Sequence, residues 1–254
     1  MQSLSVVIVC KNEAEIISRM LQSLTGLTDD IVIYDNGSTD ATLEIADHFN
    51  VQIHQGQWDG YGKTKQKSIA FAKYDWVLSL DADEIIDDDL KASLLSLQLT
   101  DEKTVYALRR KNFIGATPII YGEWGNDYQQ RLFNRRFTNW DDAEVHEKVI
   151  LPAGATVKKV DGYILHQTMK DITDYAQKTV KYAALSAEKY FRKGKKANWV
   201  KIRVAPGFTF FKYYFIKLGF LDGYYGYVCA RMSAHYTFLK YALLKKLHEQ
   251  KRPQ

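Results

Sequence analysis

The stretch LSVVIVC at residues 4–10 is short, β-branched and continuously apolar, and similar runs return as DIVIYD (30–35) and WVLSL (76–80). Such runs, bounded by polar residues, are typical of strands buried on both faces. A weaker run at 51–54 fits a further strand, and segments with helical spacing lie between the runs. Four strands alternating with helices predict an α/β fold, a mostly parallel, doubly wound sheet with right-handed crossovers.

The composition of the chain fits a globular protein but is unevenly distributed. With 254 residues, 46% hydrophobic and 26% charged, the chain is neither disordered nor a disulfide-dependent miniature. Residues 190–254 hold 14 Lys+Arg and 2 Asp+Glu, a net of +12, so residues 1–189 carry 21 against 28, a net of −7. We therefore predict an acidic domain at 1–189, with halves at 1–100 and 101–189, and a basic, aromatic, helical extension at 190–254.

Polar residues follow the predicted strands at their carboxyl ends, where open α/β sheets bind ligands. They are Asn12 and Glu13, then Asp35, then the run Asp81–Glu84. Two aspartates two residues apart, Asp81 and Asp83, suit a Mg²⁺ or Mn²⁺ ion that holds a diphosphate. A bare Asp-x-Asp tripeptide lies more often in a solvated loop than in a metal site. Here it directly follows a buried strand, and that position favours the metal-site interpretation.

Three motifs in order, VVIVCKNE, IVIYDNGSTDAT and GKTKQKSIAFAKYDWVLSLDADE, resemble glycosyltransferase family 2 over residues 4–90. The resemblance implies a GT-A fold and a metal-dependent, inverting transfer of a sugar from a nucleotide diphosphate. QQRLFNRRF (129–137), AEVHEKV (143–149) and YILH (163–166) are similar to a narrower group, the bacterial lipopolysaccharide core β-glucosyltransferases.

The family resemblance also implies roles for individual residues. The nucleoside of the donor sugar nucleotide would be bordered by Val9, Lys11, Glu13 and Asp35. Lys65 would lie beside the diphosphate, and Asp81 would face the ribose. Many members have Arg at the position of Lys65, and Lys keeps the charge but loses the planar fork. Asp83 would bind the metal directly, Asp81 would face it, and His166, at the end of a predicted strand, is either a third ligand or a core histidine.

The sequence leaves open which residue is the catalytic base and which residues contact phosphate groups. Glu147 is the first candidate for the base, Asp127 the second, and Glu144 is a further possibility. Arg131 could contact the donor diphosphate or phosphates of an anionic acceptor. Trp140 is either a sugar-stacking platform or a core residue.

The basic extension predicts contact with an anionic membrane surface. A helical projection places Phe238, Tyr241, Leu244 and Leu247 beside Lys240, Lys245 and Lys246. The alternative is that this helix packs its aromatic side on the rest of the protein. A nucleic-acid partner is disfavoured because an acidic body does not suit a polyanion.

These features together predict transfer of a hexose, glucose from UDP-glucose, to the inner core of lipopolysaccharide, the lipid A–core acceptor. No signal-peptide pattern and no apolar run of transmembrane length occurs in the sequence, so we expect a peripheral protein on the cytoplasmic face of the bacterial inner membrane. The alternatives are a polyprenyl-phosphate sugar synthase and a non-catalytic protein that binds nucleotide sugars and docks on membranes.

Overall fold

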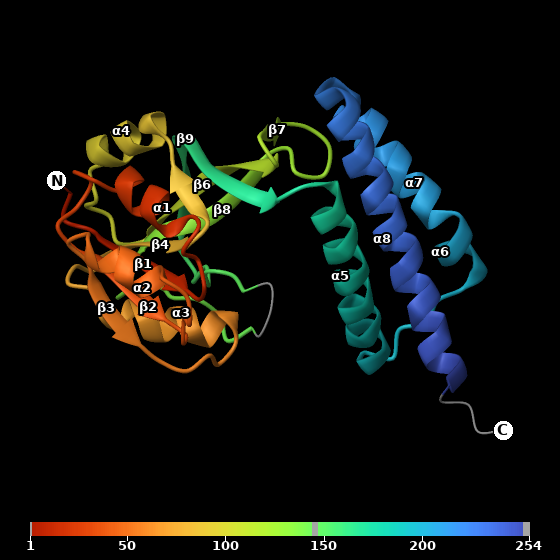
Figure 1. Cartoon of the computed structure of the whole chain (residues 1–254), viewed down its shortest axis with the longest axis horizontal. Coiled ribbons are helices and arrows are strands. Elements are labelled where there is room, and N and C mark those ends of the chain that lie inside the picture. Colours follow the sequence, from red (N-terminus) through yellow and green to blue (C-terminus); the bar gives the residue numbers. More distant parts are fainter. Residues whose placement is uncertain (1, 144–146, 251–254) are drawn as a thin grey trace. The chain divides into compact units, whose positions relative to one another are not determined.

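The computed structural model describes residues 2–143 and 147–250, which divide into two compact units (Figure 1). The first unit comprises Met1–Arg110 and Asp127–His166, and the second comprises Lys111–Asn126 and Gln167–Gln254. The boundary that we predict at residue 189 concerns function and stays a prediction.

The first unit contains the predicted parallel sheet, which is confirmed. Strand β1 pairs in parallel with β2 and β4, and β2 pairs in parallel with β3. Next to β4 lies β8, which runs antiparallel to it, and the full strand order is β3-β2-β1-β4-β8-β6-β9-β5, with β7 beside β6. The strands are β1 (Ser5–Cys10), β2 (Ile31–Asp35), β3 (Gln52–Gln55), β4 (Trp76–Asp81), β5 (Glu84–Ile86), β6 (Thr104–Ile114), β7 (Thr117–Ile119), β8 (Asp127–Asn134) and β9 (Thr156–Met169).

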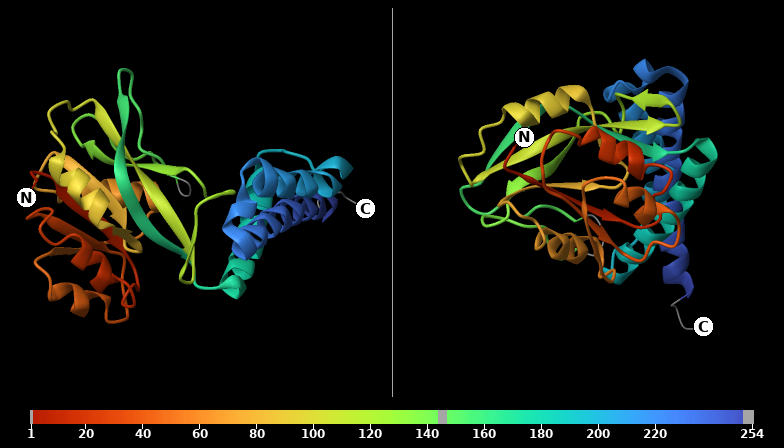
Figure 2. Two further views of the ribbon diagram at one scale, coloured as in Figure 1. Left: turned by 90° about the horizontal axis from the view of Figure 1, so that it is seen from above. Right: turned by 60° about the vertical axis from the view of Figure 1, so that its left-hand side comes forward.

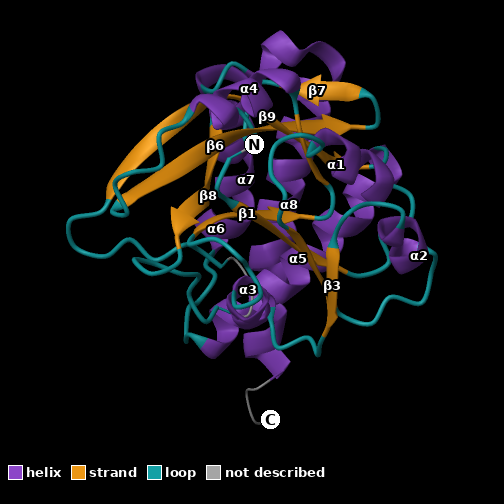
Figure 3. Cartoon of the chain, turned by 90° about the vertical axis from the view of Figure 1, so that its left-hand side faces the viewer, coloured by secondary structure: helices purple, strands orange, loops and turns teal. Residues whose placement is uncertain are grey.

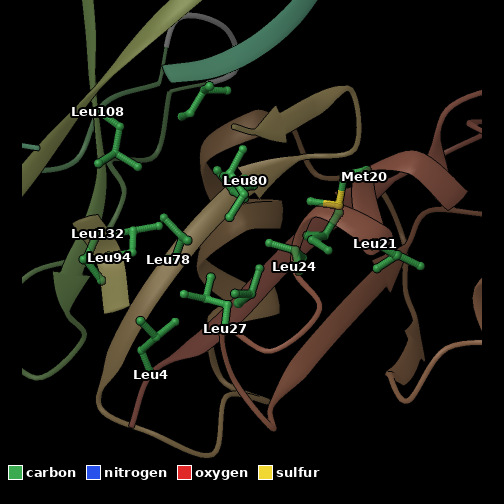
Figure 4. Packing of buried hydrophobic residues seen from close by; sticks show 14 of the residues in the cluster. Leu4, Met20, Leu21, Leu24, Leu27, Leu78, Leu80, Leu94, Leu108 and Leu132 are labelled. Atoms are coloured by element: carbon green, nitrogen blue, oxygen red, sulfur yellow. The ribbon is translucent and has the colours of Figure 1, made fainter. Parts of the chain in front are cut away.

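Helices cover both faces of these strands because β1 and β4 are apolar on both sides (Figure 3). Helices α1 (Ile17–Ser23), α2 (Thr42–Asp47) and α4 (Asp88–Ser96) share one core cluster with Ile8 and Leu80, part of which Figure 4 shows. Helix α3 (Tyr61–Ile69) packs on the other face, where Ile69 meets Val7 and Val77. Alternate strand residues thus serve opposite layers, which fixes the strand register.

Some local expectations are wrong. The polar run at 36–40 in the sequence predicts that Ser38 or Thr39 caps the helix after β2, but α2 starts after Ala41 and has no side-chain cap. Ser38 bonds to Asp35 and to the backbone of Asn12 instead. The sequence also predicts a strand at 145–151, yet the described residues of that range form only a single bridge, Trp140 to Val149. Elements β5, α4 and β7 were not anticipated.

The second unit is a mainly helical assembly that also contains β7 and the last residues of β6 and β9. Its elements are α5 (Ile172–Arg192), α6 (Trp199–Arg203), α7 (Ala205–Phe211), a π-helical turn at Lys212–Ile216, a 3₁₀ turn at Gly219–Asp222 and α8 (Gly223–Gln250). Helix α8 lies between α5 on one side and α6 and α7 on the other (Figure 2). Across the described residues, none of the helices is both long and apolar enough to span a bilayer.

Both cysteines are buried and free, one in each unit. Burial, and then the neighbouring Asp35 carboxylate, raises the pKa of the Cys10 thiol to about 12. Burial likewise raises the pKa of Cys229 to about 12.

Strand β9 approaches the start of α4 at Gly162, which has φ +94°. A Cβ atom there would lie 2.1 Å from the backbone nitrogen of Leu90. The Asp87 side chain links α4 to β9 at the same place, because it accepts hydrogen bonds from the backbone nitrogens of Leu90 (2.8 Å) and Tyr163 (2.9 Å). Only glycine fits at this crossing.

We predict that Gly162→Ala destabilises the protein more than Gly154→Ala by about 2 kcal/mol. Gly154 has a similar φ of +86°, yet a Cβ at that position would meet no atom within 4 Å, so that variant carries the backbone strain alone. Denaturant unfolding measures the free energy of unfolding of both variants. An equal loss of that free energy in the two variants would show that β9 does not approach α4 closely.

Candidate active site

A cluster of alternating charges lies at the carboxyl end of β4, with Asp81 at its centre. The Oδ1 atom of Asp81 is 2.7 Å from Lys65 Nζ, and Oδ2 is 2.7 Å from Arg131 Nη2. Lys65 comes from α3 and Arg131 from β8, the antiparallel neighbour of β4. The two cations therefore reach Asp81 from elements far apart in the sequence.

The charge network continues in both directions from these cations. Lys65 Nζ is also 2.7 Å from Glu147 Oε1, and Arg131 Nη2 is 2.6 Å from Glu84 Oε1. Arg110 extends the network, because its guanidinium is 3.5 Å from Glu84 and 2.8 Å from Asp127.

The two carboxylates first considered for the base, Glu147 and Asp127, therefore stand at the ends of one chain of ion pairs. Asp127 also accepts a hydrogen bond from Gln129 at 2.5 Å. Neither is an isolated surface carboxylate.

Burial makes this network obligatory. Lys65 is 2% exposed, Arg131 is 4% exposed and Glu84 is fully buried. A charge removed from water in this way is stable only with partners. Burial disfavours the ionised form of Asp81, but Arg131 and Lys65 outweigh it and hold the pKa of that carboxyl well below its usual range. Burial also opposes the charge of Arg131, yet Asp81 and Glu84 raise the pKa of its guanidinium.

Trp140 packs against both cations. Its ring centroid is 4.5 Å from Lys65 Nζ and 5.5 Å from the guanidinium carbon of Arg131. The side chain is buried and packs edge-on against Phe133, so the core interpretation of Trp140 holds rather than the sugar platform. Two buried donors remain without a hydrogen-bond partner among the described residues, Arg131 Nε and Trp140 Nε1.

Asp83 and His166 form the pair best suited to a divalent cation. The Oδ2 atom of Asp83 lies 3.3 Å from His166 Nε2, because β5 pairs with β9 and places Glu84 opposite His166. Within residues 2–143 and 147–250 no group of three His, Cys, Asp or Glu side chains could hold a metal. Asp83 and His166 could supply two ligands of a divalent cation, and the other ligands would have to come from a substrate and water. Asp81 has both oxygens on cations.

Asp35 lies at the neighbouring strand end and is fully buried. Its Oδ2 accepts hydrogen bonds from the backbone nitrogens of Gly37 (3.0 Å) and Ser38 (3.1 Å), and Cys10 Sγ lies 3.7 Å from Oδ1. The side-chain oxygen of the next residue, Asn36, is buried with no partner among the described residues, while its Nδ2 donates to the Gly56 carbonyl at 3.2 Å. That bond fixes the orientation of the amide and leaves its oxygen able to accept a further hydrogen bond.

The loops after β1 and β2 are tied to each other. Asn12, with φ +57°, accepts a hydrogen bond from the Thr39 backbone at 2.8 Å and donates its own backbone N–H to Ser38 Oγ at 2.9 Å. Lys11 is exposed and Glu13 is half-buried on this loop. Val9 lies in β1 opposite Tyr34 on one side and Asp81 on the other.

The structure therefore gathers most of the residues that the sequence singled out at one edge of the sheet. Lys65, Asp81, Arg131, Glu147 and Asp127 belong to one network, and Asp83 pairs with His166 beside it. Glu144 lies outside the described residues. Arg110 and Asn36 were not foreseen, and Glu84 was named only as the last residue of the polar run Asp81–Glu84, with no role of its own. A signal existed for Glu84, since it directly follows the Asp-x-Asp motif, whereas nothing in the sequence distinguishes Arg110 from its neighbour Arg109.

Comparison with known proteins places this chain in a family. The model of the family described as glycosyl transferase family 2 matches residues 5–153, which is more than half of the chain. The chain belongs to glycosyltransferase family 2. It is a glycosyltransferase with the GT-A architecture, in which the parallel β3-β2-β1-β4 block is followed by antiparallel β8.

Two of the relatives of this family 2 glycosyltransferase align with it over about nine-tenths of their length. An uncharacterized glycosyltransferase of Rickettsia bellii is 26% identical over 266 residues, covering 99% of this chain and 89% of the relative. The lipopolysaccharide core biosynthesis glycosyltransferase LpsC of Rhizobium meliloti is 28% identical over 255 residues, covering 96% and 93%. Glucosyl-3-phosphoglycerate synthase from Mycobacterium tuberculosis, crystallised with Mn²⁺ and UDP-glucose, is 25% identical over 44% of this chain and 43% of its own chain, with a TM-score of 0.36.

The burial of Lys65 makes a prediction about stability. Lys65→Gln removes the charge between Asp81 and Glu147 and should lower the free energy of unfolding by about 3 kcal/mol. Lys67→Gln is the matched control on the same helix, since Lys67 is exposed and its ion pair in the described structure is with exposed Asp59. Denaturant unfolding should leave the midpoint of the control near that of the wild type. Equal midpoints for both variants would contradict the obligatory pairing of Lys65.

Proposed function

We propose that this family 2 glycosyltransferase transfers glucose from UDP-glucose to the heptose/Kdo inner core of lipopolysaccharide, with inversion at the anomeric carbon. The observation that carries the acceptor assignment is the similarity to LpsC over 96% of the chain, including the residues beyond the family match. The charge network supports the reaction class, because it holds cations where a diphosphate would bind and carboxylates where a hydroxyl would lose its proton.

In this proposal the acceptor oxygen attacks the anomeric carbon as the bond from that carbon to the diphosphate oxygen breaks. UDP leaves with the bonding electron pair, and the acceptor proton passes to a carboxylate. Lys65 and the Nε of Arg131, which has no hydrogen-bond partner among the described residues, would stabilise the leaving diphosphate. The side-chain oxygen of Asn36, buried and likewise without a partner among the described residues, would accept the uracil N–H beside Asp35.

Glu147 is the base that we favour, with Asp127 as the alternative. Lys65 is shared between Asp81 and Glu147 before any donor arrives. A diphosphate that draws Lys65 toward itself would release Glu147, so the carboxylate would become available only when the donor is in place. This order protects the donor against hydrolysis.

A divalent cation fits the Asp83–His166 pair and, when bound, would act as a Lewis acid on the departing diphosphate. Asp83 and His166 would hold it, and Asp81 would position Lys65 and Arg131 rather than bind the ion through both oxygens. We propose that the enzyme acts at the cytoplasmic face of the bacterial inner membrane, where an anionic glycolipid acceptor would be presented.

Two other functions compete with this proposal. A polyprenyl-phosphate sugar synthase would use the same donor site with a lipid phosphate as acceptor. A non-catalytic protein would bind UDP-sugar without turnover. Donor and acceptor screens separate the three, because only the proposed enzyme would form a glucosylated core oligosaccharide.

We predict that Glu147→Gln lowers transfer at least about 100-fold, because an amide cannot take the acceptor proton. UDP release and the mass of the glucosylated acceptor measure the reaction with Mn²⁺ present. Asp142→Asn is the control, since Asp142 is an exposed carboxylate close by in the chain and bonds only to Gln66 in the described structure. A loss of about 100-fold in Asp127→Asn with full activity in Glu147→Gln would reassign the base to Asp127.

Asp83→Ala should abolish the stimulation by Mn²⁺ while leaving the fold intact, as Asp83 is partly exposed and pairs with His166. If none of these substitutions reduced transfer in folded protein, the site assignment would be wrong. UDP-glucose binding without transfer to any acceptor would favour the non-catalytic alternative.

A further inference from the structure

An apolar stripe runs along the outer side of α6, α7 and the π-helical turn. Its members follow each other at helical spacing and are each 49–60% exposed, namely Val200, Val204, Phe208, Phe211 and Phe215. Steps of three and four residues keep side chains on one face of a helix. An exposed face of this kind marks an interaction surface, because soluble surfaces scatter their large apolar residues singly.

The opposite side of the same helices is already used by the protein. Phe210 meets Tyr227 of α8 with ring centroids 5.8 Å apart, and Thr209 Oγ1 lies 3.3 Å from Thr237 Oγ1. Figures 1 and 2 show α7 lying along α8. The stripe is therefore a second apolar face, additional to the one that holds α7 in place.

The backbone around the stripe is closely packed. A Cβ on Gly226 would lie 1.8 Å from the carbonyl oxygen of Gly219, and one on Gly219 would lie 2.6 Å from that of Tyr213. Asp222 adds to this, since its carboxylate accepts hydrogen bonds from the backbone nitrogens of Ile120 and Tyr121. These contacts fix the backbone next to the C-terminal end of the stripe.

The charge beside the stripe has one sign. Residues 199–221 contain Lys201, Arg203, Lys212 and Lys217 and no acidic residue. Apolar side chains flanked by lysine and arginine suit a surface that is apolar within and anionic at its boundary, which describes the headgroup region of an acidic bilayer. A protein partner with an acidic rim would meet the charge, but nothing else in the described structure points to one.

We infer that this stripe is the surface by which the enzyme docks on an anionic lipid bilayer. The inference rests on the proposed function only in that the bilayer would carry the glycolipid acceptor. It also differs from the helix that the sequence suggested at 238–247, because Leu244 there is fully buried and Tyr241 is half-buried within the second unit.

The test is flotation of the full-length protein with vesicles, without any sugar substrate. Wild-type protein should bind vesicles of phosphatidylcholine with roughly 30% phosphatidylglycerol, chosen as a typical acidic fraction, and bind pure phosphatidylcholine weakly. The triple variant Phe208→Ser, Phe211→Ser, Phe215→Ser should lose binding by about tenfold or more.

The matched control is Val180→Ser, Tyr182→Ser, Leu185→Ser on α5, whose side chains are 50–52% exposed in the same unit. It should bind vesicles like the wild type, as should Lys245→Gln with Lys246→Gln at the end of α8. Transfer to a lipid-free core oligosaccharide should be unchanged in the Phe variant, which separates failure of docking from failure of the proposed reaction.

Three results would overturn the inference. The first is that the wild-type protein binds neither kind of vesicle. The second is that the Phe variant binds as well as the wild type. The third is that the wild type sediments as a dimer and that the Phe substitutions dissociate it. The last would assign the stripe to self-association instead.

Discussion

The buried ammonium of Lys65 is the charge around which the first unit is organised. It lies on a helix face that packs against the sheet, so its charge must be met by carboxylates that also leave water. Asp81 and Glu147 meet it, and Asp81 brings in Arg131, which in turn requires Glu84. Neutralising one buried charge thus fixes the end of β4, the start of β5, the middle of β8 and the segment at residue 147.

The need to pair buried charges also explains how the network can be stable and still exchange partners with a ligand. Each cation in the network has two carboxylate partners, so a ligand can take one partner's place without leaving a bare charge. In the proposed function, a diphosphate would exchange with the existing ion pair between Lys65 and Glu147 instead of adding an uncompensated charge.

Sequence reasoning works well where chemistry is local in the chain. The continuous apolar runs at 4–10 and 76–80 identify buried strands, and their polar ends identify the ligand-binding edge, since strand ends follow directly from the period of the pattern. Partners fixed by tertiary pairing are beyond this method. Arg110 reaches Asp127 because β6 pairs with β8, and that register is set by packing between strands distant in sequence.

The extension shows why amphipathicity alone does not identify a docking face. From 199 to 241 aromatic residues occur on every side of the helices, so a helical projection finds an apolar stripe wherever it begins. Burial decides between the stripes. At Leu244 the apolar side is fully buried within the helical unit, whereas at Phe208 and Phe211 the side facing α8 is filled by other residues. A helix that satisfies its own packing with one face and keeps an aromatic second face exposed has hydrophobic surface left to bury. Lysine and arginine beside that surface would repel one another in a water-filled dimer interface, but an acidic bilayer would neutralise them, so the charge pattern favours lipid over a second copy of the chain.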